Sequence, residues 1–123
     1  MPRDHARLKV FHMADELAVE VYQKTSSFPN REMFGITSQM RRSALSVPAN
    51  IVEGCARKSL KEYLRFLDIS YGSLAELGYY ISLSRRLEFL NEKDFITLDD
   101  KRRQCSKAMY AMIESLAKGK IEA

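Results

Sequence analysis

The sequence predicts an all-α protein that folds as an up-down-up-down bundle of four helices. The chain of 123 residues contains only five Gly and three Pro, too few for the many turns of an all-β fold. Its apolar residues recur at intervals of three and four, as on the buried face of a helix, and no segment alternates throughout as a strand would. Helix-breaking residues separate long segments of comparable length, which short loops can join into antiparallel neighbours.

We expect a single domain over residues 1–123, with helices at about 7–26, 31–57, 60–86 and 92–118. The first helix should stop before Phe28, because Pro29 cannot continue a helix interior. Its apolar face consists of Val10, Phe11, Ala14, Leu17, Ala18, Val21 and Tyr22.

The second helix is expected to begin directly after Asn30, which is a favourable N-cap residue. Pro48 lies inside it, removes one helical hydrogen bond and clashes with the preceding turn, so a kink near residues 44–48 is expected. The apolar face consists of Met33, Ile36, Met40, Ala44, Val47, Ile51 and Cys55.

The third helix should begin at the capping-box pattern of Ser59 and Glu62, in which each side chain satisfies a free amide of the other residue. It carries two apolar stripes, and the second one suggests contact with a partner subunit, because one stripe suffices in a small bundle. A few exposed aromatic residues, which are common, would explain the second stripe equally simply. Its members are Phe66, Ile69, Ser73, Tyr80, Leu83 and Leu87.

Small residues interrupt the third helix, and Gly72 and Gly78 each cost it about 1 kcal/mol relative to Ala. A close approach of a neighbouring backbone would account for them. The fourth helix should begin at Asn91 as N-cap, with Leu90 and Phe95 forming a hydrophobic staple, and end at Gly119.

Composition excludes several classes of protein. Hydrophobic residues make up 46% and charged residues 29%, which fits neither a disordered chain nor a membrane protein. The longest run without a charged residue, 43–52, is far shorter than the roughly 20 residues of a membrane span. The first ten residues lack the apolar segment of a secretory signal. Two cysteines, Cys55 and Cys105, make no disulfide framework, so we expect a cytoplasmic protein with both thiols in the core.

Catalytic chemistry finds little support in the sequence. There is no phosphate-binding glycine loop and no metalloprotease, CxxC or nucleophile-elbow motif. His5 and His12 lie together near one terminus and suggest no ligand spacing. Glu53 and Glu76 could form a carboxylate pair, but ion pairs with Arg41 or Arg42 are the simpler use. We therefore expect no catalytic residue, no cofactor and no bound metal.

A polar ridge follows one face of the second helix and consists of Gln39, Ser43, Ser46, Asn50, Glu53 and Arg57. Its short Ser and Asn side chains differ from the Lys and Glu that usually cover a solvated face. They suit a hydrogen-bonded contact with another helix, within the chain or between subunits, although a solvated face remains an equal alternative. The residues expected to make structural or oligomer contacts are Gln39, Ser43, Ser46, Pro48, Asn50, Glu53, Ser73 and Glu76.

The chain is mildly basic, with a formal charge of +4. Most basic pairs lie at helix C-termini, where cations complement the helix dipole. Lys58, Lys61 and Arg65 lie instead at a helix start with Glu62 as the only local counter-ion, which suggests phosphate contact, although a structural role explains them as well. Tyr63 could stack a base, but its place in the apolar stripe favours core packing. The candidate nucleic-acid-binding residues are Arg41, Arg42, Arg57, Lys58, Lys61 and Arg65.

A long motif connects the chain to a known family. Residues 28–54 read FPNREMFGITSQMRRSALSVPANIVEG, followed by EYLRFL at 62–67 and GSLAEL at 72–77. These stretches resemble the bacterial four-helix-bundle family named after proteins encoded in intervening sequences of 23S ribosomal RNA genes. The resemblance extends from about residue 11 to residue 116.

This resemblance implies a left-handed up-down-up-down bundle that assembles as a homopentamer and is not an enzyme. The family is related to the accessory variability determinant of diversity-generating retroelements, a basic pentameric barrel that binds nucleic acid and a reverse transcriptase. Five copies would multiply the charge of +4 and strengthen the attraction for polyanions. We therefore expect a homopentamer that binds nucleic acid, RNA first. The alternative is a structural scaffold for protein partners with no nucleic-acid role.

Overall fold

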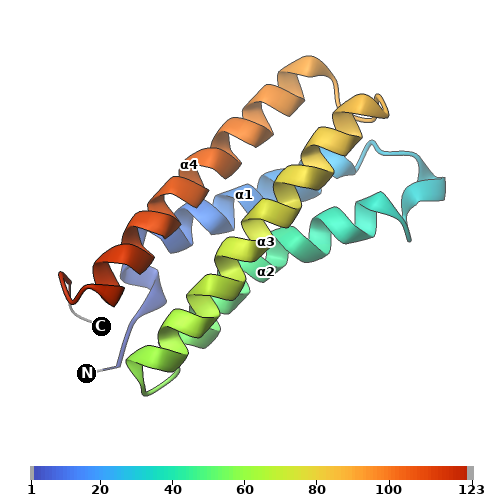
Figure 1. Cartoon of the computed structure of the whole chain (residues 1–123). Helices are drawn as coiled ribbons and strands as arrows, with labels where there is room; N and C mark the ends of the chain where they lie inside the picture. Colours follow the sequence, from blue (N-terminus) through green and yellow to red (C-terminus); the bar gives the residue numbers. More distant parts are fainter. Residues whose placement is uncertain (1, 122–123) are drawn as a thin grey trace.

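The computed structural model describes residues 2–121, which form four long α-helices and no strand (Figure 1). The helices are α1 (Lys9–Thr25), α2 (Ile36–Cys55), α3 (Leu60–Arg86) and α4 (Glu92–Ala117). Two short 3₁₀-helices, η1 (His5–Arg7) and η2 (Asn30–Glu32), precede α1 and α2. The predicted all-α, four-helix class is confirmed, whereas the left-handed sense stays a prediction.

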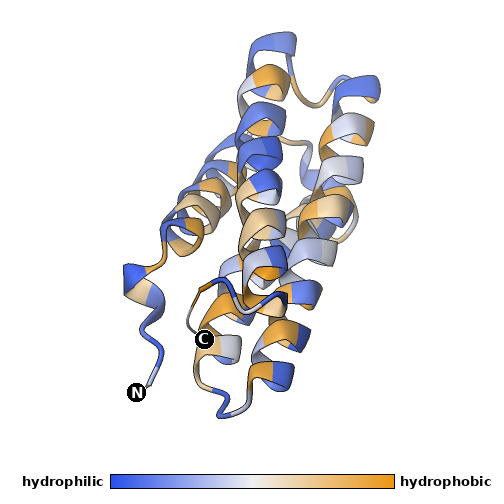
Figure 2. Cartoon of the chain, turned by 60° about the vertical axis from the view of Figure 1, so that its left-hand side comes forward, coloured by the Kyte–Doolittle hydropathy of each residue, from blue (hydrophilic) through white to orange (hydrophobic). Residues whose placement is uncertain are grey.

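Consecutive helices run in opposite directions, so the chain goes up and down twice (Figure 1). Each helix contacts the next one along the chain, and α4 returns to contact α1. Both chain ends therefore lie at the same end of the bundle as the turn between α2 and α3, a placement seen in Figures 1 and 2. No helix within residues 2–121 is long and apolar enough to cross a membrane.

The start of α2 differs from the sequence prediction of a helix from residue 31. Asn30 opens the short helix η2 instead of capping α2, and Gly35 is the N-cap residue from which α2 begins at Ile36. Met33 and Phe34 are exposed, so extending the helix over them would bury no apolar surface to offset the helix-breaking tendency of Gly35. Phe28, by contrast, is buried and anchors the loop in the core.

The starts of α3 and α4 follow their local signals, whereas α1 begins at Lys9 without a side-chain cap and α2 ends at Cys55, two residues before the predicted end. The Ser59 hydroxyl accepts a hydrogen bond from the Glu62 amide at 3.1 Å, and α3 has the predicted bounds. The Glu62 carboxylate bonds to Arg65 and not to the Ser59 amide, so only half of the capping box is present. The Asn91 side chain accepts from the Asp94 amide at 2.7 Å and starts α4.

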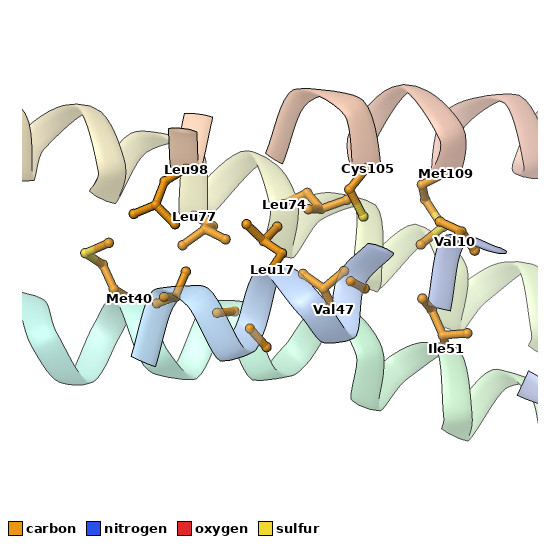
Figure 3. Packing of buried hydrophobic residues seen from close by; sticks show 14 of the residues in the cluster. Val10, Leu17, Met40, Val47, Ile51, Leu74, Leu77, Leu98, Cys105 and Met109 are labelled. Atoms are coloured by element: carbon orange, nitrogen blue, oxygen red, sulfur yellow. The ribbon is translucent and has the colours of Figure 1, made fainter. Parts of the chain in front are cut away.

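The core lies between the four helices and is apolar along its length. Figure 3 shows side chains of all four helices meeting there, and Figure 2 shows the polar residues gathered on the outside. Both thiols, Cys55 and Cys105, are buried in this cluster, and so is Tyr63, in agreement with the sequence prediction. The largest fully buried aliphatic members are Leu17, Met40, Ile51, Leu67, Leu74, Leu77, Ile81, Leu90, Leu98, Met109 and Leu116.

Pro48 in α2 and the two glycines of α3, Gly72 and Gly78, have different surroundings. α2 continues through Pro48, which is buried, to Cys55. A Cβ atom at Gly78 would lie 2.7 Å from the guanidinium carbon of Arg102 on α4, so this glycine makes room for a side chain and not for the expected backbone. A Cβ atom at Gly72 would meet nothing within 4 Å, and the expected close approach is absent there within the described residues.

Candidate nucleic-acid interface

The polar ridge of α2 forms a hydrogen-bonded seam with α3 at its centre. The hydroxyl oxygens of Ser46 and Ser73 lie 2.8 Å apart, and the Asn50 amide donates to the Ser46 hydroxyl at 2.8 Å. Ser43 is buried and donates to the Met40 carbonyl at 3.0 Å. The ridge is therefore a contact between two helices of one chain at these positions.

A second bond of this seam was missed by the sequence reasoning. The Ser70 hydroxyl, fully buried on α3, donates to the Val47 carbonyl of α2 at 2.7 Å. Pro48 lies next to Val47 on the same buried stretch of α2. The run of small residues in α3, which includes Ser70, was the available signal, since small side chains let two helices approach closely.

The arginines of the first half of α2 are engaged within the bundle. Arg42 forms an ion pair with Glu76 of α3 and donates to Gln39 at 3.1 Å. The hydrogen bond that Arg42 donates to Glu76 raises the pKa of Arg42 above its ordinary value. Arg41 donates to the hydroxyl of Thr25 at 2.9 Å, and its guanidinium lies 4.7 Å from the ring centroid of Tyr22.

The four basic residues around the α2–α3 turn form a compact group. Arg57 pairs with Glu53, and Arg65 pairs with Glu62 at 2.9 Å. Both guanidiniums lie over the ring of Phe66, with their carbons 4.8 Å and 4.4 Å from its centroid. The two arginines are thus held by a carboxylate on one side and a ring on the other.

Lys58 and Lys61 differ from these arginines. Both side chains are exposed, and neither has an ion-pair partner or a hydrogen-bond partner among residues 2–121. They flank Ser59, the N-cap residue of α3, whose first-turn amides carry a partial positive charge. Two free ammonium groups beside a helix N-terminus make a local field that favours an anion.

The antiparallel topology brings further cations to the same end. The Arg3 side chain donates to the Arg57 carbonyl and lies 4.2 Å from the ring centroid of Tyr63. Both chain ends lie at this end of the bundle, as Figures 1 and 2 show, and both are basic. We call the following set the basic end: Arg3, Arg7, Lys9, Arg57, Lys58, Lys61, Arg65, Lys118 and Lys120.

Carboxylates at the basic end are fewer than cations. Glu53, Glu62 and Glu114 are engaged by Arg57, Arg65 and Lys118. Asp4 accepts a hydrogen bond from a backbone amide of η1. The hydrogen bond from Arg65 lowers the pKa of Glu62, so this carboxylate stays ionised at neutral pH. A clear excess of positive charge remains.

The two thiols are poorly suited to nucleophilic chemistry. Burial raises the pKa of Cys105 to about 11 and also raises the pKa of Cys55. A thiol attacks as its thiolate, so both groups are inert at neutral pH. Within residues 2–121, no three or more His, Cys, Asp and Glu side chains are grouped so that they could hold a metal ion.

Five of the exposed apolar side chains lie on α1, on α2 and in the loop between them. We call this surface the α1–α2 face and define it by Val19, Tyr22, Met33, Phe34 and Leu45. Phe34 is 95% exposed and Val19 is 52% exposed. Two hollows of about 300 and 430 Å³ lie here, and Tyr22 and Leu45 line both of them.

A buried hydroxyl without a partner lies at the same face. Thr37 lines the larger hollow beside Phe34, and its hydroxyl has no hydrogen-bond partner among the described residues. The second stripe of α3 is only partly covered by the chain itself, since Ile69 and Leu87 are 40% and 49% exposed, and its contact with another subunit stays a prediction. Phe66 lies under two arginines and Ser73 bonds to Ser46.

Comparisons with known proteins give one matching family model and a similar solved structure. A family model described as 23S rRNA-intervening sequence protein matches residues 6–111. No curated protein matches the sequence. A crystal structure at 1.70 Å of a protein with unknown function from the S23 ribosomal protein family, from Bacteroides thetaiotaomicron VPI-5482, is similar with a TM-score of 0.80. The two sequences are 23% identical, and the alignment covers 85% of this chain and 95% of that one.

Proposed function

We propose that this chain, which belongs to the 23S rRNA-intervening sequence protein family, is a non-enzymatic, self-associating bundle. It binds RNA through its basic end. The observation that carries the proposal is the pair of free ammonium groups of Lys58 and Lys61, set among seven further cations at one end of the bundle. Phosphate contacts by Lys and Arg supply most of the affinity of sequence-independent nucleic-acid binding.

The remaining cations of the α2–α3 turn support this role. Arg57 and Arg65 are held in place over Phe66, so little side-chain entropy is lost when they contact a phosphate. The side chains of their carboxylate partners, Glu53 and Glu62, are 49% and 41% exposed. Such exposed pairs are worth little, and exchanging one for a phosphate contact therefore costs little.

Arg41 and Arg42 take another role in this proposal. They lie on the first half of α2, roughly 20 Å along the helix from Arg57 at ~1.5 Å per residue. Their contacts with Thr25 and Glu76 join α2 to α1 and α3. We therefore assign them to the packing of the bundle, and the phosphate contacts to the basic end.

Self-association is supported by the α1–α2 face. An apolar surface that contains a nearly fully exposed Phe34, together with a buried and unpartnered Thr37 hydroxyl, suits coverage by another protein surface. The homopentamer is the assembly that the family resemblance implies. A ring of copies would present several basic ends to one RNA and multiply their effect.

The same apolar face favours a second candidate function. It would also bind a different protein, and the chain would then act as a scaffold with no nucleic-acid role. The cations of the basic end would in that case serve only the helix C-termini of α2 and α4 and the ion pairs with Glu53 and Glu62.

Titration of a fluorescently labelled 23S-type RNA hairpin, followed by anisotropy at several salt concentrations, tests the proposal. We expect log affinity to fall linearly with log salt, with a slope of about −0.7 to −0.9 per neutralised phosphate. The variant Lys58→Glu/Lys61→Glu should weaken binding about tenfold or more and flatten the slope. A duplex DNA of equal length shows whether RNA is preferred.

The matched control changes the same amount of charge at the opposite end of the bundle. Arg86 and Lys93 are exposed there, at the end of α3 and the start of α4. Arg86→Glu/Lys93→Glu should lower affinity only slightly. Equal losses in both variants would mean that net charge alone matters, and an absence of binding at low salt would leave the scaffold function.

A further inference from the structure

We propose that the hollow between Tyr71 of α3 and Tyr110 of α4 is a second RNA contact, in which an unpaired base stacks on a tyrosine ring while nearby cations hold its phosphate. This inference rests on the proposed RNA binding. It adds a second site, separate from the basic end, whose ligand is single-stranded RNA. The hollow has a volume of about 390 Å³ and is lined by Tyr71, Arg102, Arg103, Ser106, Lys107 and Tyr110.

The two tyrosines come from neighbouring helices and lie against each other at the surface. Their ring centroids are 6.0 Å apart and their planes are inclined by 47°. Tyr71 is 36% exposed and Tyr110 is 55% exposed, so both rings remain accessible. Single exposed aromatic residues are ordinary, but a pair of them beside three cations is the combination with which proteins bind unpaired bases.

Two of the three cations of the hollow, Arg102 and Arg103, are oriented by one carboxylate, that of Asp99. Arg102 donates to Asp99 through two nitrogens at 3.0 Å each, and Arg103 donates to the other oxygen at 2.8 Å. Asp99 is largely buried on the protein side of these bonds, with 14% of its side chain exposed. One carboxylate therefore faces two guanidiniums, and one positive charge remains uncompensated.

Lys107 and Gly78 complete the site. Lys107 is exposed and has no ion-pair or hydrogen-bond partner within residues 2–121, so it adds a second uncompensated charge. Gly78 leaves the space that the Arg102 side chain occupies, since a Cβ atom there would lie 2.7 Å from its guanidinium. An apolar partner would have to desolvate these cations, whereas a phosphate satisfies them.

The hollow lies within reach of an RNA held at the basic end. Tyr71 follows Lys61 by ten residues along α3, about 15 Å at ~1.5 Å per residue. Tyr110 precedes Lys118 by eight residues along α4, about 12 Å on the same scale. A hairpin bound at the basic end would therefore place its single-stranded flank along the seam between α3 and α4.

The test uses a short unstructured RNA that carries one 2-aminopurine, whose fluorescence falls when the base stacks. In the wild-type protein we expect quenching on binding. Tyr71→Ala/Tyr110→Ala should weaken binding of this RNA about tenfold and abolish the quenching. Tyr71→Phe/Tyr110→Phe keeps both rings and should keep both signals, which guards against a loss that reflects only folding.

A matched control and a second variant sharpen the test. Tyr79 is a tyrosine of α3 with 57% exposure outside the hollow, and Tyr79→Ala should change neither affinity nor quenching. Lys107→Glu, on an exposed side chain, should weaken the single-stranded RNA several-fold and lower the salt slope by about one phosphate contact. Both variants should keep the assembly size of the wild type by light scattering.

The outcomes separate this inference from the proposed function. If the Ala variant binds and quenches as the wild type does, while the hairpin still depends on Lys58 and Lys61, the stacking site is wrong and the basic end stands. If Lys58→Glu/Lys61→Glu leaves the affinity for the hairpin unchanged but Tyr71→Ala/Tyr110→Ala still abolishes the quenching, the stacking site is supported and the basic end is wrong. If 2-aminopurine riboside monophosphate binds as tightly as the RNA, the ligand is a free nucleotide, which overturns the RNA assignment.

Discussion

Ser46 of α2 and Ser73 of α3 share a hydrogen bond of 2.8 Å, and Asn50 donates a second bond to the Ser46 hydroxyl. Both serines are half-buried, so this small network lies where two helices pack and water is mostly excluded. The Ser73 hydroxyl has no other hydrogen-bond partner among the described residues, whereas the Ser46 hydroxyl also accepts from Asn50. The seam is therefore more sensitive to the loss of Ser46, which bonds to both neighbours, than to the loss of Ser73.

A double-mutant cycle on this pair tests that dependence. Ser46→Ala should lower the free energy of unfolding by about 1 kcal/mol, because it leaves the half-buried Ser73 hydroxyl without a partner. Ser73→Ala should cost less, because the Ser46 hydroxyl keeps its bond from Asn50. The double variant should cost clearly less than the sum of the two single changes. Urea denaturation measures all three values, and strict additivity would show that the bond does not form in solution.

The two glycines of α3 allow a matched comparison of helix propensity. Gly72→Ala should stabilise the protein by about 0.5–1 kcal/mol, since the new methyl group meets no other atom of the described chain within 4 Å. Gly78→Ala should gain less, because Arg102 must move away from its place over the glycine. Thermal and urea denaturation of both variants supply the comparison.

The outcome at these glycines is informative in either direction. Equal stabilisation by both changes would mean that Arg102 is not held against Gly78. A loss of stability in Gly72→Ala would mean that another surface, such as a second copy of the chain, packs against this position in solution.

Alkaline pH should destabilise the fold through its buried acids. Burial raises the pKa of Cys105 to about 11 from an ordinary value of 9.0, and it also raises the pKa of Tyr63 and Cys55. Above pH 9 the unfolded thiol loses its proton while the folded one keeps it, so stability falls as pH rises. A shift of this size corresponds to about 2–3 kcal/mol lost between about pH 9 and 11.

Urea denaturation at pH 8 and at pH 10.5 measures this loss, and Cys105→Ala is the control. The alanine variant should be less stable at pH 8, because it leaves a small cavity, but it should lose less stability on going to pH 10.5. A remaining loss is expected from Tyr63 and Cys55. An identical loss in both proteins would rule out Cys105 as a titrating group.

Sequence reasoning succeeded where the deciding signal is local. Ser59 and Asn91 cap α3 and α4 through their own side chains, three residues from their partners, and the predicted starts of these helices are correct. The predicted start of α2 was wrong because Asn30 opens η2 instead of capping α2, which begins after Gly35. The apolar pattern included Met33 but does not reveal that Met33 and its neighbour Phe34 are exposed.

The candidate site was predictable in part for the same reason. The cluster from Arg57 to Arg65 is contiguous in sequence, and it was proposed on that ground. Arg3 joins it only because the bundle folds the N-terminus onto the α2–α3 turn. The pairing of Tyr71 with Tyr110 depends on the relative register of α3 and α4, which no spacing within either helix fixes.

The α1–α2 face should control self-association. Phe34→Ser removes an apolar side chain that is 95% exposed, so we expect the free energy of unfolding of the subunit to change by less than about 0.5 kcal/mol. The assembly should nevertheless become weaker, as measured by sedimentation velocity over a range of concentrations. Ile96→Ser on α4, at 56% exposure, is the control and should leave the assembly intact. If Phe34→Ser assembles like the wild type, copies of the chain meet through a different surface, and this face is left for another protein.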